Sequence, residues 1–160
     1  MSVFDASVYQ ARRASAVELV NDRAMGGLVI GTGAEFAFLT GSFASSHERL
    51  TALVIAPGGA TVVAPVTDIQ SLGLDDAADV EVVGWRDGED PYELVAEVLG
   101  GGEVGLGSSL TADHVFALQA RVADTVLASD AVAELFMVKD DEEAVELAKA
   151  GAAIDRVHER

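Results

Sequence analysis

The sequence of 160 residues predicts an α/β fold, with a mixed β-sheet of about five to six strands and helices on its faces. The first supporting observation is a pair of runs rich in β-branched residues, 51–56 and 61–64, joined by Pro57-Gly58-Gly59-Ala60. This pattern is typical of a hairpin, whose strands are antiparallel neighbours. The second is that short apolar runs alternate with helical patterns after residue 80, which favours crossover helices and parallel pairs. A sheet with both kinds of pair is therefore expected.

The first half should begin with a helix over residues 5–23, because apolar residues recur there at helical spacing without Gly or Pro. Met25-Gly26-Gly27 ends this helix. Leu28-Val29-Ile30 is a short apolar run that suits a buried strand, and Gly31-Thr32-Gly33 suits a turn. The two strands of the hairpin complete this half of the chain.

The second half should begin with a strand over residues 80–85. Asp90 followed by Pro91 is typical of an N-cap and the first helical position, and Gly100-Gly101-Gly102 stops the helix after Leu99. Three further elements are expected: a strand over 103–107, a helix over 111–122 capped by Thr111, and a short strand over 125–128. Strands and helices thus alternate in this half.

An acidic cluster, Asp140-Asp141-Glu142-Glu143, should open a last helix that continues to Arg160. Carboxylates satisfy free amides at a helix start and oppose the positive end of the helix dipole, so capping is favoured over a metal site there. An apolar stripe that includes Leu147 and Ile154 runs along this helix without an evident partner. We therefore expect the chain to be the leading part of a larger protein.

Composition and charge narrow the function classes. The net charge of −17 is spread along the chain and would repel phosphate backbones, so nucleic acid is not an expected partner. Because there is no cysteine, disulfides, thiolate zinc sites and cysteine nucleophiles are excluded. No stretch approaches the ~18 apolar residues of a membrane span, and residues 1–13 contain no apolar h-region. A soluble cytoplasmic protein is the expectation.

Two candidate motifs lack the spacing that a dinucleotide site or a zinc site requires. Gly31-Thr32-Gly33 follows a strand, but Phe36 stands where a dinucleotide fingerprint needs its third glycine. The three histidines, His47, His114 and His158, lack the paired spacing of a zinc site. The sequence therefore predicts no catalytic residue and no metal ligand in this chain.

One segment invites a binding interpretation. Residues 40–49 connect an apolar stretch to the first hairpin strand and gather His47, Glu48 and Arg49 on what should be an exposed loop. Loops positioned by a sheet are where binding residues tend to lie. A solvated turn is the alternative that the three residues alone leave open.

Several segments, in this order, resemble the amino-terminal domain of creatinases, prolidases and Xaa-Pro aminopeptidases. The segments are Leu39-Thr40-Gly41-Ser42-Phe43 with 46–55, Trp85 with Glu89-Asp90-Pro91-Tyr92, Gly105 to His114, and Phe136 to Glu143. The chain departs from the pattern at Phe38, where Tyr is common, and at Phe136, where Arg is common.

The resemblance implies a creatinase/prolidase-type domain over residues 1–138 and a linker helix over 139–160 leading into an absent catalytic domain. In such enzymes the carboxy-terminal domain holds two divalent ions (Mn, Co or Zn) that activate a water against an Xaa-Pro peptide bond. The amino-terminal domain assists assembly of a homodimer and closes the substrate pocket, often that of the neighbouring subunit. No cofactor is then expected in this chain itself.

The resemblance also assigns roles to the loop. Arg49 would pair with the carboxylate of a peptide substrate, His47 would meet a polar group, and Glu48 would pair with the peptide amine or with Arg49. The expected function is thus that of a non-catalytic domain of an Xaa-Pro peptidase. Two alternatives remain open: a stand-alone α/β binding module, and the same domain from a creatinase-type amidinohydrolase.

Overall fold

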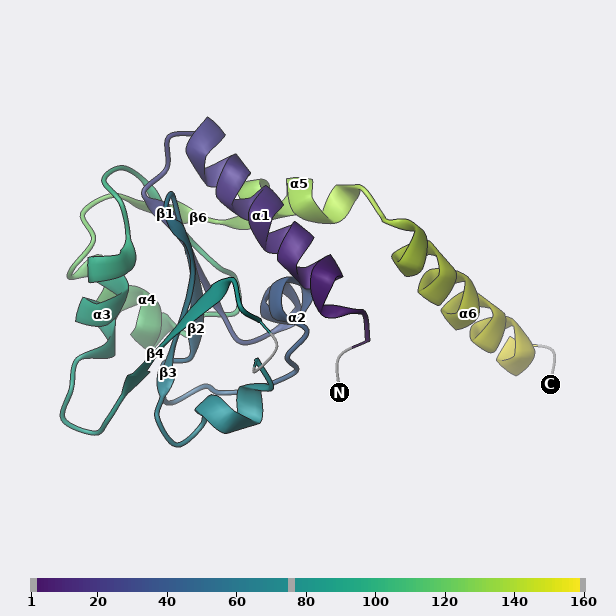
Figure 1. Cartoon of the computed structure of the whole chain (residues 1–160), viewed down its shortest axis with the longest axis horizontal. Helices are drawn as coiled ribbons and strands as arrows, with labels where there is room; N and C mark the ends of the chain where they lie inside the picture. Colours follow the sequence, from purple (N-terminus) through teal and green to yellow (C-terminus); the bar gives the residue numbers. More distant parts are fainter. Residues whose placement is uncertain (1–2, 75–76, 159–160) are drawn as a thin grey trace.

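The computed structural model describes residues 3–74 and 77–158, which form a six-stranded mixed sheet between helices (Figure 1). The strand order across the sheet is β4-β3-β2-β1-β5-β6. The strands are β1 (Gly27–Gly31), β2 (Ala52–Ala56), β3 (Gly59–Pro65), β4 (Val80–Trp85), β5 (Val104–Leu106) and β6 (Thr125–Leu127). The predicted fold class and the predicted mixed sheet are confirmed.

The sheet contains both antiparallel and parallel pairs of strands. Strands β2 and β3 pair antiparallel as predicted, but Gly59 and Ala60 already belong to β3, with Gly59 opposite Ala56, so the turn is shorter than the four residues expected. Strand β2 is also antiparallel to β1, whereas the β3–β4, β1–β5 and β5–β6 pairs are parallel. The parallel β5–β6 pair is joined by the crossover helix Ala112–Gln119, whereas the connection from β3 to β4 contains the 3₁₀ turn Ile69–Leu72.

Helices cover both faces of this sheet (Figure 1). The helices are α1 (Ala6–Asp22), α2 (Ala34–Thr40), α3 (Pro91–Val98), α4 (Ala112–Gln119), α5 (Ser129–Met137) and α6 (Asp141–His158), with a 3₁₀ turn η1 (Ile69–Leu72) after β3. Helices α1, α2 and α5 contribute to the core on one face, and α3 and α4 contribute to the core on the other. Both faces of the central strands are therefore buried.

Alternation along β1 shows how the two cores are built. Leu28 and Ile30 point into the core shared with α1 and α2, whereas Val29 points into the core shared with α3 and α4. All three are 0% exposed. Burying each such side chain contributes about 1.5–3 kcal/mol, so this central strand anchors both layers.

Two helices were not predicted. The stretch Phe36–Leu39 lies in the seven-residue helix α2, which ends at Gly41 with φ 75°, a left-handed conformation that favours glycine. Helix α5 follows β6, where no element was predicted. Both helices are shorter than the windows in which helical periodicity is recognisable, and tertiary packing of their apolar residues stabilises them instead.

Of the two predicted helix caps, Asp90 forms its capping hydrogen bonds and Thr111 does not. Asp90 caps α3 as predicted, because its carboxylate accepts hydrogen bonds from the amides of Tyr92 and Glu93. Thr111 occupies the N-cap position of α4, but its hydroxyl makes no capping hydrogen bond, so that part of the prediction is wrong. This hydroxyl oxygen is buried and has no partner among the described residues.

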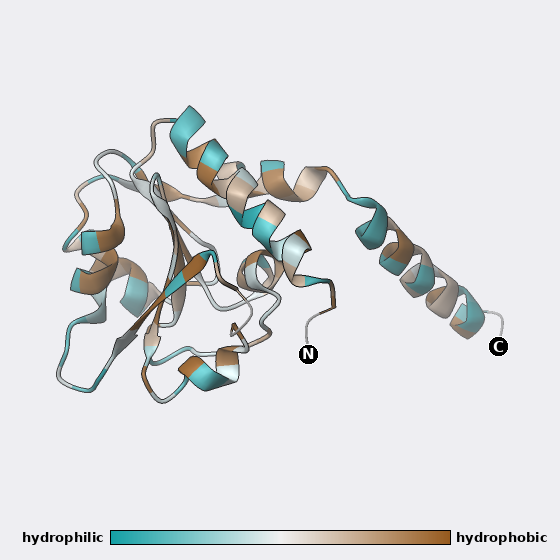
Figure 2. Cartoon of the chain, viewed as in Figure 1, coloured by the Kyte–Doolittle hydropathy of each residue, from teal (hydrophilic) through white to brown (hydrophobic). Residues whose placement is uncertain are grey.

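Helix α6 projects away from the rest of the domain (Figure 1), and no residue of it is buried. Hydrophobic and hydrophilic residues alternate along its length, and beyond its first turn no other described helix or strand lies beside it (Figure 2). The prediction that this helix reaches Arg160 extends beyond the described residues, which end at His158. Among the described helices, none is long and apolar enough to cross a membrane.

Candidate functional site

The segment 40–49 is held firmly at its start. The hydroxyl of Thr40 donates to the carbonyl of Phe36 at 2.7 Å and accepts from the amide of Ser42 at 3.1 Å. A side chain at Gly41 would lie 2.8 Å from the ring of Tyr9, so only glycine fits here. Residues 40–42 are buried, which corrects the expectation that the whole segment is an exposed loop.

The second half of the segment is fixed by Ser46. Its amide donates to the hydroxyl of Thr32 at 3.0 Å, and the Thr32 hydroxyl donates to its carbonyl at 2.9 Å. Its own hydroxyl donates to the carbonyl of Arg49 at 2.5 Å. These bonds hold both ends of the short turn formed by residues 47–49.

The structure places two of the predicted site residues in solvent. His47 and Glu48 are exposed, and the Nε2 atom of His47 lies 3.4 Å from the hydroxyl of Ser45. Neither residue pairs with Arg49 among the described contacts. Their side chains are therefore free to meet another molecule, and they form no preassembled site with one another.

Arg49 is half-buried and has a defined position. Its Nη2 atom donates to a carboxylate oxygen of Asp87 at 2.8 Å, and Nη1 donates to the hydroxyl of Thr67 at 3.3 Å. The guanidinium lies 4.9 Å from the ring centroid of Trp85. Because the side chain of Asp87 is 90% exposed, this ion pair is strongly screened by water and contributes little to stability.

The loop carries a further candidate that the sequence interpretation left out. Phe43 is 70% exposed although it is flanked by the buried Ser42 and lies on an ordered segment. A polar cavity of about 740 Å³ lies beside it, lined by Ser45, Thr51 and Asp68 among others. The hydroxyl oxygen of Thr51 is buried there and has no hydrogen-bond partner in the part of the chain that the structure describes. The available signal in the sequence was a phenylalanine within the otherwise small and polar segment between Gly41 and His47.

The buried side chain of His114 connects the loop to helices α3 and α4. It is buried, and its Nδ1 atom lies 2.9 Å from the hydroxyl of Tyr92. Burial lowers the pKa of His114, against the opposing effects of a hydrogen bond with the backbone of His47 and of the charge on Asp113. The imidazole thus joins α4 to α3 and to the loop.

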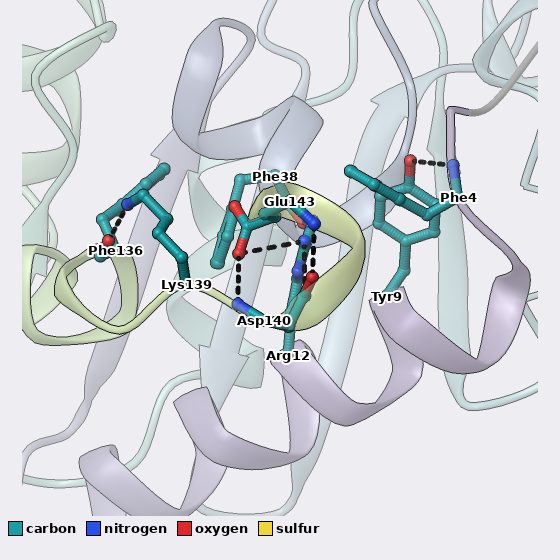
Figure 3. A network of polar contacts seen from close by, with 8 residues as sticks. All are labelled: Phe4, Tyr9, Arg12, Phe38, Phe136, Lys139, Asp140 and Glu143. Carbon is teal, nitrogen blue, oxygen red and sulfur yellow. Dashed lines mark hydrogen bonds and ion pairs between the residues drawn. The ribbon is translucent and has the colours of Figure 1, made fainter. Parts of the chain in front are cut away.

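A second polar region lies where α6 joins the domain (Figure 3). The Nη2 atom of Arg12 on α1 donates to Asp140 at 3.1 Å and lies 3.5 Å from a carboxylate oxygen of Glu143. The Nη1 atom donates to the carbonyl of Phe38 at 3.2 Å. A groove of about 680 Å³ borders this junction, between α1, the end of α5 and the start of α6.

The acidic cluster at this junction caps the helix. A carboxylate oxygen of Asp140 accepts from the amide of Glu143 at 2.7 Å, and Glu143 accepts from the amide of Asp140 at 3.2 Å. This reciprocal arrangement is a capping box, and the predicted capping role of the acidic cluster is confirmed. In residues 3–74 and 77–158, no group of three or more histidines or carboxylates is arranged to hold a metal ion.

A family model for the creatinase/prolidase N-terminal domain matches residues 12–138. The chain belongs to this family. The matched residues include the whole sheet, all of α2 to α5, and both ends of the loop described above. Helix α6 follows the last matched residue.

Relatives of this creatinase/prolidase N-terminal domain are dipeptidases by name. The probable dipeptidase PepE of Mycobacterium tuberculosis is 45% identical over 163 residues, and the match covers 98% of this chain and 44% of that protein. The crystal structure of dipeptidase PepE from Mycobacterium ulcerans has a TM-score of 0.92 at 42% identity, again over 98% of this chain and 44% of that one. The chain therefore spans less than half the length of these relatives.

A more distant structure shows the same fold. The crystal structure of recombinant prolidase from Thermococcus sibiricus has a TM-score of 0.78 at 24% identity, and the match covers 95% of this chain and 43% of that chain. At this level of identity the likeness concerns the arrangement of the sheet and its helices alone. The creatinase/prolidase N-terminal fold is thus retained where most residues differ.

Proposed function

We propose that this chain is the non-catalytic amino-terminal domain of a metal-dependent Xaa-Pro peptidase, where it contributes to dimer formation and closes the substrate pocket. The observation that carries the proposal is the extensive match to the leading part of dipeptidases more than twice as long. Closure of the substrate pocket is supported by the loop at residues 46–49. His47 and Glu48 are exposed there, and Arg49 pairs with an exposed Asp87 that a ligand could replace.

Arg49 is suited to bind the carboxylate end of a peptide. Its guanidinium is held over Trp85, while its ionic partner Asp87 is almost fully exposed. A substrate carboxylate arriving from outside could take the place of Asp87 without moving the guanidinium. Such charge-assisted pairs gain strength when water is excluded, as happens when a second surface closes over the loop.

Phe43 and His47 would complete the contact. Phe43 offers apolar surface, which suits the ring of a proline residue, and His47 offers a polar edge that can donate or accept a hydrogen bond. In a homodimer, this loop would reach the catalytic domain of the neighbouring subunit. The subunit interface would then bring together groups that neither chain supplies alone.

The hydrolytic chemistry belongs to residues outside this chain. Two divalent ions, Mn, Co or Zn, would lower the pKa of a bound water and polarise the scissile carbonyl in the catalytic domain. The described residues offer no cluster that fits such ions, so no step of hydrolysis is assigned to them.

A comparison of the 160-residue chain with the longer protein that contains it tests the proposal. Both are assayed with an Xaa-Pro dipeptide in Mn, Co or Zn, with and without a chelator. We expect the longer protein to hydrolyse the dipeptide in a chelator-sensitive reaction and the chain alone to show none. Chelator-sensitive turnover by the chain alone, or hydrolysis of creatine but not of the dipeptide by the longer protein, would refute the proposal.

A further inference from the structure

The direction in which α6 leaves the domain depends on very few contacts. No described residue of α6 is buried, so packing does not hold it. Within the described ranges, every hydrogen bond and ion pair from residues 140–158 to the rest of the domain ends on Arg12. We propose that Arg12 is a positioning residue that fixes the orientation of α6.

Arg12 joins three elements through one planar group (Figure 3). It is rooted in α1, it donates to the carbonyl of Phe38 in α2, and it binds both Asp140 and Glu143 at the start of α6. A guanidinium presents its donors in a fixed fork, so satisfying these acceptors together sets their relative positions. A lysine has a single point of charge and could not do this.

Arg12 itself has little freedom to move. It is 9% exposed, and its guanidinium carbon lies 4.2 Å from the ring centroid of Phe38, 4.9 Å from that of Phe4 and 5.5 Å from that of Tyr9. Phe38 in turn lies against Phe136, with ring centroids 4.3 Å apart. The aromatic rings thus hold the guanidinium at a fixed point on the body of the domain.

The two carboxylates bound by Arg12 are also the two members of the capping box. Asp140 and Glu143 each accept from the amide of the other, so their side chains are coupled rigidly to the first turn of α6. With 18 residues, α6 is roughly 27 Å long at 1.5 Å per residue. A small tilt at the first turn therefore moves the far end by many ångströms.

Charge at the junction strengthens the dependence on Arg12. The groove beside it is lined by five acidic residues: Glu134, Asp140, Asp141, Glu142 and Glu143. Lys139 is the other cation that lines the groove, and its ammonium donates to the carbonyl of Phe136. Glu134 is paired with Arg23, so Arg12 is the cation that offsets the carboxylates of Asp140 and Glu143, and without it their like charges would repel one another.

The inference about α6 stands apart from the proposed function. If that function is right, Arg12 would also orient the catalytic domain that follows α6, and this consequence alone rests on the proposed function. The direction of α6 can be measured on the 160-residue chain itself. A broad distance distribution for α6 would not change the result expected from the peptidase assay. A negative peptidase assay would not change the distribution expected for α6.

Electron–electron double resonance on the 160-residue chain tests the inference. Because the chain has no native cysteine, spin labels can be placed at Glu18→Cys on α1 and Ala152→Cys on α6, both exposed positions. We expect one narrow distance distribution in the otherwise unchanged chain. Arg12→Met should lose this narrow peak and give a broad distribution, because it keeps an apolar stem but removes every donor.

A second variant and a control separate orientation from folding. Asp140→Asn with Glu143→Gln keeps side-chain oxygens for the capping box but removes the charges that Arg12 binds, so it should also lose the narrow peak. Arg121→Met removes the guanidinium that pairs with Asp90 and lies over Tyr92, away from α6, and should keep the peak. Circular dichroism verifies that each variant is folded.

The proposal requires a narrow distribution in the parent chain and its loss in the Asp140→Asn/Glu143→Gln variant, and in Arg12→Met where that variant folds. A broad distribution in the parent chain, or a narrow peak kept at the same distance in either folded junction variant, would overturn it.

Discussion

The guanidinium of Arg13 holds the carboxylate of Asp79 through two parallel hydrogen bonds. Its Nε atom lies 2.8 Å from one oxygen and its Nη2 atom 2.6 Å from the other, while Nη1 donates to the carbonyl of Leu39 at 2.8 Å. Arg13 is 2% exposed. This single side chain therefore joins α1 to the end of α2 and to the residue that precedes β4.

Arg13→Met should lower the free energy of unfolding by roughly 2–4 kcal/mol, because the carbonyl of Leu39 and part of the Asp79 carboxylate would lose their partner. Urea denaturation measures this change. The matched control is Arg121→Met, whose pair with Asp90 is more exposed and should contribute about 0–1 kcal/mol. Equal losses in the two variants would contradict the prediction.

Stability should fall in acid through Asp79. The hydrogen bond from Arg13 holds the pKa of Asp79 below its usual value, although burial acts in the opposite direction. A carboxyl whose pKa is lower in the folded state stabilises the fold above its unfolded pKa, near about 4, and this contribution is lost as the pH falls through the folded pKa.

The pair of Arg13 variants measures this acid dependence. The difference in unfolding free energy between the parent chain and Arg13→Met should be constant from neutral pH to about pH 4 and shrink below it. Urea titrations at successive pH values give the difference directly. A difference that grows in acid would show that the carboxylate of Asp79 is not stabilised by Arg13.

Trp85→Phe should be destabilising by roughly 1–3 kcal/mol, because it leaves a buried acceptor without its donor. The indole nitrogen of Trp85 donates to the carbonyl of Leu50 at 2.9 Å in the core between the sheet and α3. Urea denaturation followed by circular dichroism is the measurement. Phe116→Leu, at a 70% exposed aromatic, is the control and should change stability by less than about 0.5 kcal/mol.

Local patterns in the sequence were sufficient for the strands and the hairpin. The β-branched runs of β2 and β3 and the Asp90-Pro91 start of α3 carry their own signals, and they were found. The short helix α2 was not, since its seven residues contain less than two full apolar turns and its position depends on packing against α1.

The roles of the arginines could not be read from local patterns. Arg12 and Arg13 lie within a helix, where charged residues usually face water, and yet both are buried. Their acceptors lie far along the chain: Phe38, Leu39, Asp79 and Asp140. For the same reason, the sequence indicates the loop that carries Arg49 but does not indicate its ionic partner. That partner is Asp87, which lies 38 residues away.

Helix α6 should be the least protected helix in hydrogen exchange. It has no buried residue, so local opening of its backbone costs less free energy than opening of the core strands, although the helix remains its dominant conformation. Amides of Leu147 to Val157 should exchange much faster than those of Leu53 to Ile55 in β2. Equal protection in a monomer at low concentration would show that α6 is part of the core, contrary to the structure.

The kinetic effect of Arg49→Ala in the longer protein tests the central claim most directly, which is that the loop of this domain binds substrate. We predict that KM for an Xaa-Pro dipeptide rises about tenfold or more, since a hydrogen bond to a charged group contributes about 1.5–3 kcal/mol. The melting temperature should be nearly unchanged, because the pair with Asp87 is a surface pair. Arg86→Ala, at the exposed neighbour of Trp85, is the matched control and should leave KM unchanged. An unchanged KM in Arg49→Ala, with the oligomeric state intact, would contradict the account and make residues 46–49 a solvated turn.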